Sequence, residues 1–445
     1  MLDAPGPLPR DMLRDLLSIR RDPLAYLVRT AARFGDRVAF PLPTTPVLLV
    51  NSVAGARRVL VENGSAWSKR TIQYGSLSLV TGSGLLTSDG TAWRTARRAV
   101  QPAFHHSGLD VVAEQSVAAA DRLRERWPAD DDAVVDADAA VLQATLEVVG
   151  RTLFGTDVAD DGERVVSAVL GALEVVIARA RTPLPVPAWV PTPSNRRLAR
   201  ARRVLDEVVD TVVARRRAAG AGPDDDDLLA LLLRSVESGA LPPEAVRAEL
   251  VTMVIAGHET VASALSWTLH LLAEHPEAQA RLHAELDAVL AGRAPTWADL
   301  PALTWTRAVV DEALRLYPPA WVVTRRAEED DVVDGVATPA GTLVIVSPWL
   351  LHRRADAWAD PERFDPERFT DGRSAPRGAY LPFGAGSRLC IGRDFALVEA
   401  VLVLAALLRD RSVAPGPGRP PQVEALVTLR PRGGLPLRLR PRGPS

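Results

Sequence analysis

Residues 383–392 of the 445-residue chain read Phe383-Gly384-Ala385-Gly386-Ser387-Arg388-Leu389-Cys390-Ile391-Gly392. Cys390 is the only cysteine, which excludes an internal disulfide framework and a zinc site with several cysteine ligands. An apolar helix is predicted from Asp394 onward, so Cys390 would lie at a helix N-terminus, where unpaired amides and the dipole favour a thiolate. A lone cysteine is more often a small buried hydrophobe. Here flanking glycines allow close approach of a flat ligand, and the setting suits an iron ligand beside an anionic group.

The stretch matches a pattern of five residue types at fixed spacing, F-x-x-G-x-R-x-C-x-G. It resembles the haem-binding loop of the cytochrome P450 monooxygenases. The resemblance implies a mainly α-helical fold with a small β-rich lobe and a long central helix that crosses over the haem. It also implies haem b (iron protoporphyrin IX) as the cofactor, bound through the iron to the cysteine. The matching positions are Phe383, Gly386, Arg388, Cys390 and Gly392.

Composition sets limits on the class of protein. Apolar residues make up 47% of the chain, enough for a large core, and the formal charge of −2 argues against a nucleic-acid binder. No stretch has the roughly 18 apolar residues of a membrane span, and Asp and Arg recur near the N-terminus, so no membrane anchor or signal peptide is predicted. We expect a cytoplasmic monomer of bacterial type. Residues 1–445 are predicted to form a single domain, with β-rich parts at about 36–60, 320–350 and 410–440.

One long helix is predicted from Pro243 to about Glu274, long enough to cross the molecule. Its middle reads Ala256-Gly257-His258-Glu259-Thr260. A glycine in a helix interior costs about 1 kcal/mol, so something should compensate for it. Threonine hydroxyls bond back to the carbonyl one turn earlier, and local widening of a helix often marks function. From the residues alone, the threonine could equally be satisfied by its own backbone and the glutamate paired with an arginine.

This segment matches the oxygen-activating pattern of the resembled family, [A/G]-G-x-[D/E]-T. The resemblance implies that Ala256 and Gly257 leave room for dioxygen and that Thr260 holds a water molecule. Glu259 would relay protons from solvent. His258 is expected to turn into the protein rather than to bind iron.

The two carboxylates of a haem need cationic hydrogen-bond donors, and the planar guanidinium group of arginine can donate two parallel hydrogen bonds to a carboxylate. Trp93 and Arg97 share a helix face, which could simply be a solvated basic face. The family pattern W-x-x-x-R matches both, and their counterparts hydrogen-bond a haem propionate. Arg325 is expected to reach a propionate, with Arg326 as the alternative. His105 and His106 could cap a helix or touch the cofactor, and neither role is assigned.

A further motif is structural. Glu312-Ala313-Leu314-Arg315 matches the helical E-x-x-R of the family, whose members bury this pair with another arginine. We expect Arg368 to be the third member, with Arg363 as the alternative. Such a network would support the cysteine loop and would not be catalytic.

The substrate cavity is predicted to be apolar. Residues 68–89 lack periodicity and are predicted to form a long loop, which in the family covers the substrate. Because none of the expected pocket residues is charged, the substrate should be held mainly by apolar burial. A terpene is the first choice, with a polyketide or a fatty acyl chain as alternatives. The expected pocket residues are Thr252, Ile255, Trp321, Val322, Val323 and Leu426.

The resemblance implies a monooxygenase that inserts one oxygen atom from O2 into a C–H or C=C bond. One cysteine cannot ligate an iron–sulfur cluster, so electrons should come from separate proteins, a ferredoxin and its reductase. Arg94 and Arg98 could attract an acidic partner. The alternatives are a peroxide-driven or non-oxygenating enzyme of the same fold, a haem-binding protein without turnover, and a helical scaffold without a cofactor. The Glu259 and Thr260 pair argues against the first two.

Overall fold

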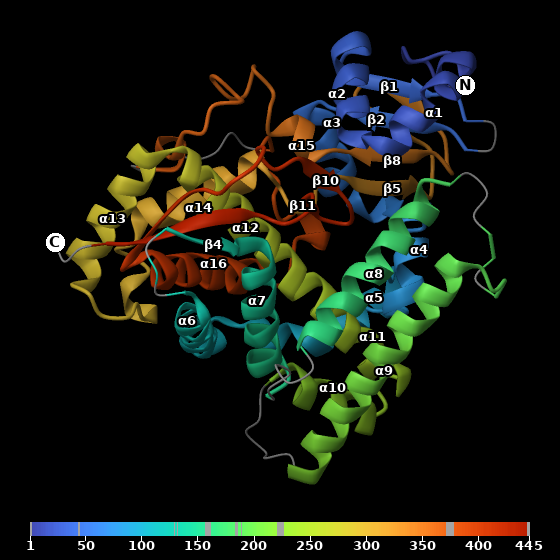
Figure 1. Cartoon of the computed structure of the whole chain (residues 1–445). Coiled ribbons are helices and arrows are strands. Elements are labelled where there is room, and N and C mark those ends of the chain that lie inside the picture. The colour runs from blue at the N-terminus through green and yellow to red at the C-terminus, as the bar shows by residue number, and fades with distance from the viewer. Residues whose placement is uncertain are drawn as a thin grey trace.

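The computed structural model describes residues 2–42, 45–128, 130, 132–155, 162–182, 186–187, 189–219, 227–370 and 378–442. A helical body carries a smaller β-rich lobe (Figure 1). The helices are α1 (Pro9–Arg21), α2 (Pro23–Phe34), α3 (Val53–Arg57), α4 (Ile72–Thr81), α5 (Gly90–Val100), α6 (Leu109–Arg126), α7 (Ala137–Leu153), α8 (Gly162–Ala180), α9 (Pro193–Ala219), α10 (Leu228–Glu237), α11 (Glu244–Met253), α12 (Glu259–Glu274), α13 (Pro276–Leu290), α14 (Thr304–Leu316), α15 (Pro348–Leu351) and α16 (Arg393–Leu408).

The β-rich lobe is built from strands that are far apart in the sequence. In its main sheet, with strand order β1-β2-β8-β5-β3, β2 and β8 are parallel and the other pairs are antiparallel. Smaller sheets pair β10 with β11 and β6 with β7, and a three-stranded sheet of β12 with β4 and β9 packs against α7, α12 and α16 of the helical body. The strands are β1 (Arg37–Phe40), β2 (Val47–Val50), β3 (Trp67–Ser68), β4 (Ala133–Asp136), β5 (Val323–Ala327), β6 (Asp331–Val333), β7 (Val336–Thr338), β8 (Leu343–Val346), β9 (Arg411–Pro415), β10 (Val423–Ala425), β11 (Leu429–Pro431) and β12 (Pro436–Pro441).

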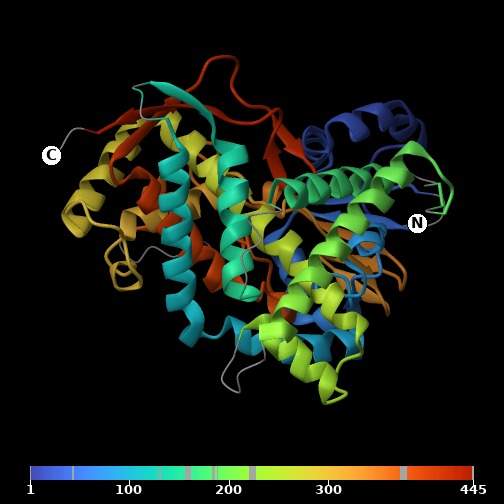
Figure 2. The ribbon, with the colours of Figure 1, turned by 60° about the horizontal axis from the view of Figure 1, so that its bottom comes forward.

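The core of the helical body surrounds α16, the helix that follows the cysteine loop. From Leu397 to Leu408 every side chain of α16 is buried, because all of them except Glu399 are apolar. It packs against α6, α12 and α14. Figure 2 shows α6 beside α7 and α8 beside α9 on the outside of this core. The cysteine loop is thereby attached to a helix that is buried over most of its length.

The predicted long helix is confirmed, with one local change. Helix α11 continues through a π-helical turn at Val254–His258 into α12, and the three segments run through the middle of the molecule (Figure 1). The π turn falls on the glycine and the residues next to it, where the sequence indicates a widened helix. Two residues of this π turn, Ala256 and Gly257, line the cavity described below.

The prediction of a loop over residues 68–89 is wrong in part. Residues Ile72–Thr81 form helix α4, which begins after Thr71, whose hydroxyl accepts from the Tyr74 N–H. Its apolar residues are spread around the helix and Gly75 interrupts them, so no helical period is visible in the sequence. Residues 69–71, before α4, and residues 82–89, between α4 and α5, remain without a helix or strand.

Candidate active site

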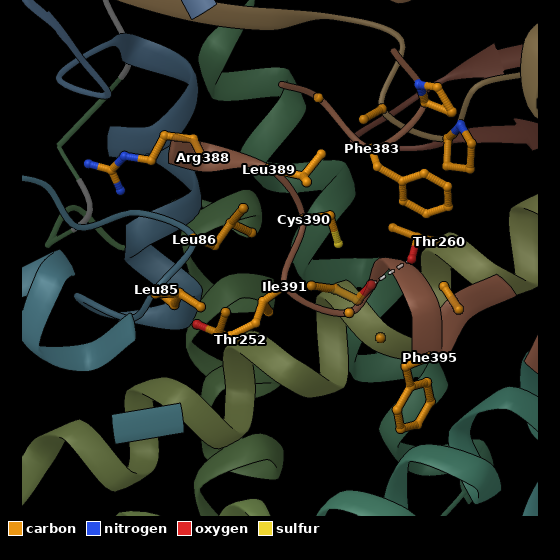
Figure 3. A pocket seen from close by; sticks show the side chains of 18 of the residues that line it. Leu85, Leu86, Thr252, Thr260, Phe383, Arg388, Leu389, Cys390, Ile391 and Phe395 are labelled. Carbon is orange, nitrogen blue, oxygen red and sulfur yellow. Dashed lines mark hydrogen bonds between the residues drawn. The ribbon is translucent and has the colours of Figure 1, made fainter. Parts of the chain in front are cut away.

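A cavity of about 300 Å³ lies next to the loop that carries Cys390. Its walls come from α5, the central helix, β5 and the segment before α5. Most of the described residues that line it are apolar, and none of them is a carboxylate. Figure 3 shows Cys390, Thr260 and Leu85 around this space. The cavity therefore joins the two stretches of sequence that carry the strongest patterns.

The backbone of the cysteine loop makes close approaches that require glycine. The Cys390 N–H donates to the Phe383 carbonyl oxygen at 3.0 Å and closes the turn. Gly386 has a φ of +68°, and a Cβ atom there would lie 2.0 Å from the carbonyl oxygen of Leu60. Gly392 immediately precedes α16. The Cys390 side chain is accessible from the cavity although it lies deep within the protein.

The surroundings of the free Cys390 thiol favour the thiolate less than predicted. Burial raises the pKa of the thiol above its usual value, and the Gly392 backbone and Arg97 lower it only in part. The helix N-terminus was expected to favour the thiolate, but the loss of water around the sulfur outweighs the amides and cations. A coordinated metal ion deprotonates a thiol outright. The thiolate would therefore depend on the iron itself.

Four cationic side chains line the cavity: Lys69, Arg97, Arg325 and Arg388. Burial lowers the pKa of Arg97, lowers that of Arg388 to about 10, and lowers that of Lys69 well below its usual range. Buried cations are costly unless they are paired. Arg388 pairs with Asp89, which does not line the cavity, and no carboxylate among the described lining residues is there to pair with Lys69, Arg97 or Arg325. A flat group that carries two carboxylates and binds metal beside Cys390 fits this arrangement.

The predicted pair on α5 lies on the cavity. Arg97 donates from Nη1 to the carbonyl oxygen of Leu389, next to Cys390 in the chain, at 3.2 Å. The Arg388 guanidinium lies 3.8 Å from the centre of the Trp93 ring and pairs with Asp89. Trp93 thus supports Arg388 by stacking, a contact that its spacing with Arg97 did not predict.

Of the two arginines on β5, only Arg325 lines the cavity. It is buried, and its Nη1 donates to the Thr324 carbonyl oxygen at 2.9 Å, whereas Arg326 is exposed. The alternation of side chains along a strand separates them. Sequence reasoning missed Lys69, whose Nζ donates to the Leu86 carbonyl oxygen at 2.8 Å. One signal was available, since Lys69 is the only lysine in the chain.

The π-helical segment faces the cavity with Ala256 and Gly257, and Thr260 lies one turn further on. The Thr260 hydroxyl donates to the Ala256 carbonyl oxygen at 2.6 Å, so the threonine bonds to its own backbone as well as lining the cavity (Figure 3). A Cβ atom at Gly257 would lie 2.9 Å from Val149 of α7. The glycine is therefore also needed for helix packing, which compensates for its cost.

Glu259 lies on another side of the helix and does not line the cavity. It is fully buried, and its Oε1 accepts from the Thr428 hydroxyl at 2.8 Å. Burial raises the pKa of Glu259 to about 7, although Arg430 and the Thr428 hydroxyl lower it. The carboxyl group can therefore gain or lose a proton near neutral pH.

His258 is also turned into the protein. Its Nδ1 lies 2.7 Å from the Val254 carbonyl oxygen, and burial lowers its pKa to about 4, so the imidazole is neutral. His105 and His106 are exposed, and neither lines the cavity.

The family model of cytochrome P450 matches residues 4–436. This chain belongs to the cytochrome P450 family. It is similar to cyclooctat-9-en-7-ol 5-monooxygenase of Streptomyces melanosporofaciens, with 37% identity over 425 residues, covering 93% of this chain and 90% of the relative. It is also 34% identical to pentalenene oxygenase of Streptomyces avermitilis, over 99% of this chain and 98% of that protein. The crystal structure of CYP175A1 from Thermus thermophilus superposes with a TM-score of 0.80 at 33% identity, covering 98% of this chain and 100% of that one.

As a cytochrome P450, this protein is a monooxygenase, an oxidoreductase that uses O2, a redox partner and a hydrophobic substrate. The family implies a haem with a cysteine thiolate ligand. The cation cluster and Cys390 on one cavity fit such a group. Within the described ranges, no helix has the length and apolar character of a membrane span.

The P450 chain brings its predicted structural triad together between α14, which carries Glu312 and Arg315, and the short 3-10 turn Pro366–Phe369, which carries Arg368. Arg315 donates to both carboxylate oxygens of Glu312, at 2.6 and 2.8 Å, and both side chains are fully buried. The Arg368 Nε lies 3.4 Å from Glu312 Oε1, whereas Arg363 contributes its backbone carbonyl oxygen. Arg315 also donates to the carbonyl oxygen of His352, whose Nε2 accepts from a backbone N–H just before the cysteine loop.

Only some of the residues predicted to form the substrate pocket line the cavity of this P450. Thr252 and Val323 line it, whereas Ile255, Trp321, Val322 and Leu426 do not. The Trp321 indole packs in the β-rich lobe and donates to the Leu426 carbonyl oxygen at 2.9 Å. Val322 immediately precedes β5 and packs against the same core cluster as Trp321. Ile255 is buried in the core of the helical body.

Proposed function

We propose that this cytochrome P450 binds haem b through Cys390 and oxidises a hydrophobic natural-product intermediate, with a cyclic terpene as the first candidate. One observation carries the proposal: an apolar cavity holds Cys390, a cluster of cations and Thr260 on its walls. The two Streptomyces relatives, named for oxidation of cyclooctat-9-en-7-ol and pentalenene, support the choice of a terpene.

In this proposal the cations bind the two haem carboxylates. Lys69, Arg97, Arg325 and Arg388 supply donors from four different parts of the chain. When bound, the haem supplies iron that binds and activates O2, with the cysteine thiolate donating electron density to it. The protein holds Cys390 in place and excludes bulk water from the cavity.

Glu259 and Thr260 are proposed to move protons. The Glu259 carboxyl group is buried, titrates near neutral pH and is adjacent in the chain to Thr260, whose hydroxyl lies on the cavity. A group with a pKa near the working pH is the most effective proton donor and acceptor. Ala256 and Gly257 would leave space for dioxygen beside Thr260. The intact pair favours use of O2 over use of peroxide.

The electrons are proposed to come from a ferredoxin and its reductase. Arg94 and Arg98 are exposed on α5, while Trp93 and Arg97 of the same helix line the cavity. The exposed arginines would attract an acidic protein, and the attraction would weaken with rising salt concentration.

The substrate would be held by apolar contact. Leucine and valine side chains from several segments of the chain line the space, and each Å² of apolar surface buried contributes about 25 cal/mol. The cavity has no carboxylate among its described lining residues, and in this proposal its cations bind the haem carboxylates rather than the substrate. A hydrocarbon skeleton with few polar groups therefore fits it. These apolar residues include Leu85, Leu86, Val149, Leu153 and Val323.

The experiment compares substrates with the purified haem-loaded protein, a ferredoxin, its reductase and NADPH. Cyclic sesquiterpenes and diterpenes are expected to bind most tightly in absorbance titrations and to yield products one oxygen atom heavier. Faster turnover of a long-chain fatty acid or of a polyketide would overturn the terpene assignment. Equal turnover with hydrogen peroxide alone would indicate a peroxide-driven enzyme, and tight binding without any product would indicate a haem-binding protein without turnover.

A further inference from the structure

Residues 82–89, here called the cavity segment, form one wall of the cavity through Leu85 and Leu86. On one side the segment is attached to the cation cluster. Lys69 donates to the Leu86 carbonyl oxygen at 2.8 Å, and Arg388 donates to the Ser88 carbonyl oxygen at 3.0 Å. These two hydrogen bonds hold the side of the segment that faces the cations, and a different element holds its other side.

That element is α11. The Leu85 N–H donates to Glu249 Oε2 at 3.0 Å. The Glu249 side chain belongs to a residue that is only 1% exposed. Burial raises its pKa to about 7, and the hydrogen bond from Leu85 is the influence that lowers it. A buried carboxyl group is costly, so its interaction with the segment has to compensate for the lost hydration.

The backbone of the cavity segment lies directly on α11. A Cβ atom at Gly84 would lie 2.3 Å from the Thr252 hydroxyl oxygen and 2.8 Å from the Ala248 carbonyl oxygen. Arg247 donates from Nη1 to the Val80 carbonyl oxygen at 2.9 Å, which anchors the end of α4 just before the segment. Successive residues of α11 thus hold both the beginning and the middle of this stretch.

We propose that Glu249 is a positioning residue for substrate, which fixes the Leu85 backbone to α11 so that Leu85 and Leu86 present their side chains to the cavity. The inference rests on the proposed function only in treating this cavity as the substrate site. Nothing in the sequence pattern assigns Glu249, because it lies outside the oxygen-activating motif. Losing its hydrogen bond would release this wall of the cavity while leaving the cysteine loop in place.

Hydrogen exchange of the haem-loaded protein, resolved to single amides by mass spectrometry, tests this. Glu249→Met is expected to raise exchange of the Leu85 amide and its neighbours about tenfold or more, because one hydrogen bond is lost from a local opening equilibrium. Glu249→Gln keeps an acceptor but not the charge, so a rise of several-fold is expected. Glu244→Gln removes a charge from an exposed position on the same helix and should change nothing. Amides of α16 should keep their protection in every variant.

A second readout is the affinity for a cyclic terpene by absorbance titration. The Met variant is expected to bind the probe at least several-fold more weakly, with an unchanged haem spectrum. Wild-type exchange of Leu85 in both Glu249 variants would overturn the proposal. Equal loss of protection throughout the chain would overturn it too, since that result means a general structural role. Because exchange requires no turnover, it can fail or succeed independently of the proposed oxidation.

Discussion

Glu259→Gln is expected to lower the rate of product formation by about 10²-fold or more, the size of effect that a positioned proton donor and acceptor has on a reaction. Glutamine keeps the shape of the side chain and can still accept from Thr428, but it cannot titrate. The wild-type carboxyl group has a pKa of about 7 because burial raises it. The measurement is product formed per NADPH consumed, with a terpene substrate that the wild type oxidises. Haem content should be unchanged, since Glu259 does not line the cavity.

Thr428→Val is the matched control for this role. The Thr428 hydroxyl donates to Glu259 Oε1 at 2.8 Å, and this bond lowers the pKa of the carboxyl group. Without it the ionised form is less stabilised, so the pKa rises and the pH profile of turnover should move to higher pH. Wild-type yields in the Gln variant at every pH, or an unmoved profile in the Val variant, would contradict proton transfer by Glu259.

Arg315→Met is expected to lower the free energy of unfolding by about 3–5 kcal/mol, because it leaves the Glu312 carboxylate buried without its main partner. Arg315 donates to both carboxylate oxygens of Glu312 and to the carbonyl oxygens of His352 and Pro361. The segment that these bonds hold leads to the cysteine loop. The measurement is denaturant unfolding followed by circular dichroism, with haem content determined in parallel.

Two further variants show whether the buried charge is the cause. Glu312→Leu combined with Arg315→Met should recover part of the loss, since no buried carboxylate then remains, but Arg368 loses Glu312 as a partner and carbonyl groups are still left without donors. Arg197→Met breaks an exposed pair with Glu174, whose side chains are 60% and 53% accessible, and should cost less than about 1 kcal/mol. A loss in Arg315→Met as small as in Arg197→Met would show that the pair does not support the fold.

The sequence was most informative where chemistry imposes a fixed spacing. Position 386 must be glycine because a Cβ atom there would collide with the carbonyl oxygen of Leu60. Cys390 must follow at a fixed number of residues so that its side chain reaches the cavity. Trp93 and Arg97 could be placed on one face because a helix repeats every 3.6 residues. In each case a short stretch of chain determines the geometry.

The assignments that failed depend on packing between distant segments. Trp321 is apolar and close to Val323 in sequence, yet it belongs to the core of the β-rich lobe. No local rule separates a pocket residue from a core residue of the same type. Lys69 and Glu249 reach the cavity segment only through the tertiary fold, so spacing could not link them to it.

The absorption spectrum of the dithionite-reduced protein under carbon monoxide, recorded for the wild type and for Cys390→Ser, tests the central claim most directly. Thiolate-ligated haem predicts a Soret band at unusually long wavelength in the wild type. The serine variant should lose that band, because Cys390 is the only cysteine and its side chain lies on the cavity. A wild-type protein without the band after haem supplementation, or a serine variant that keeps it, would contradict the account.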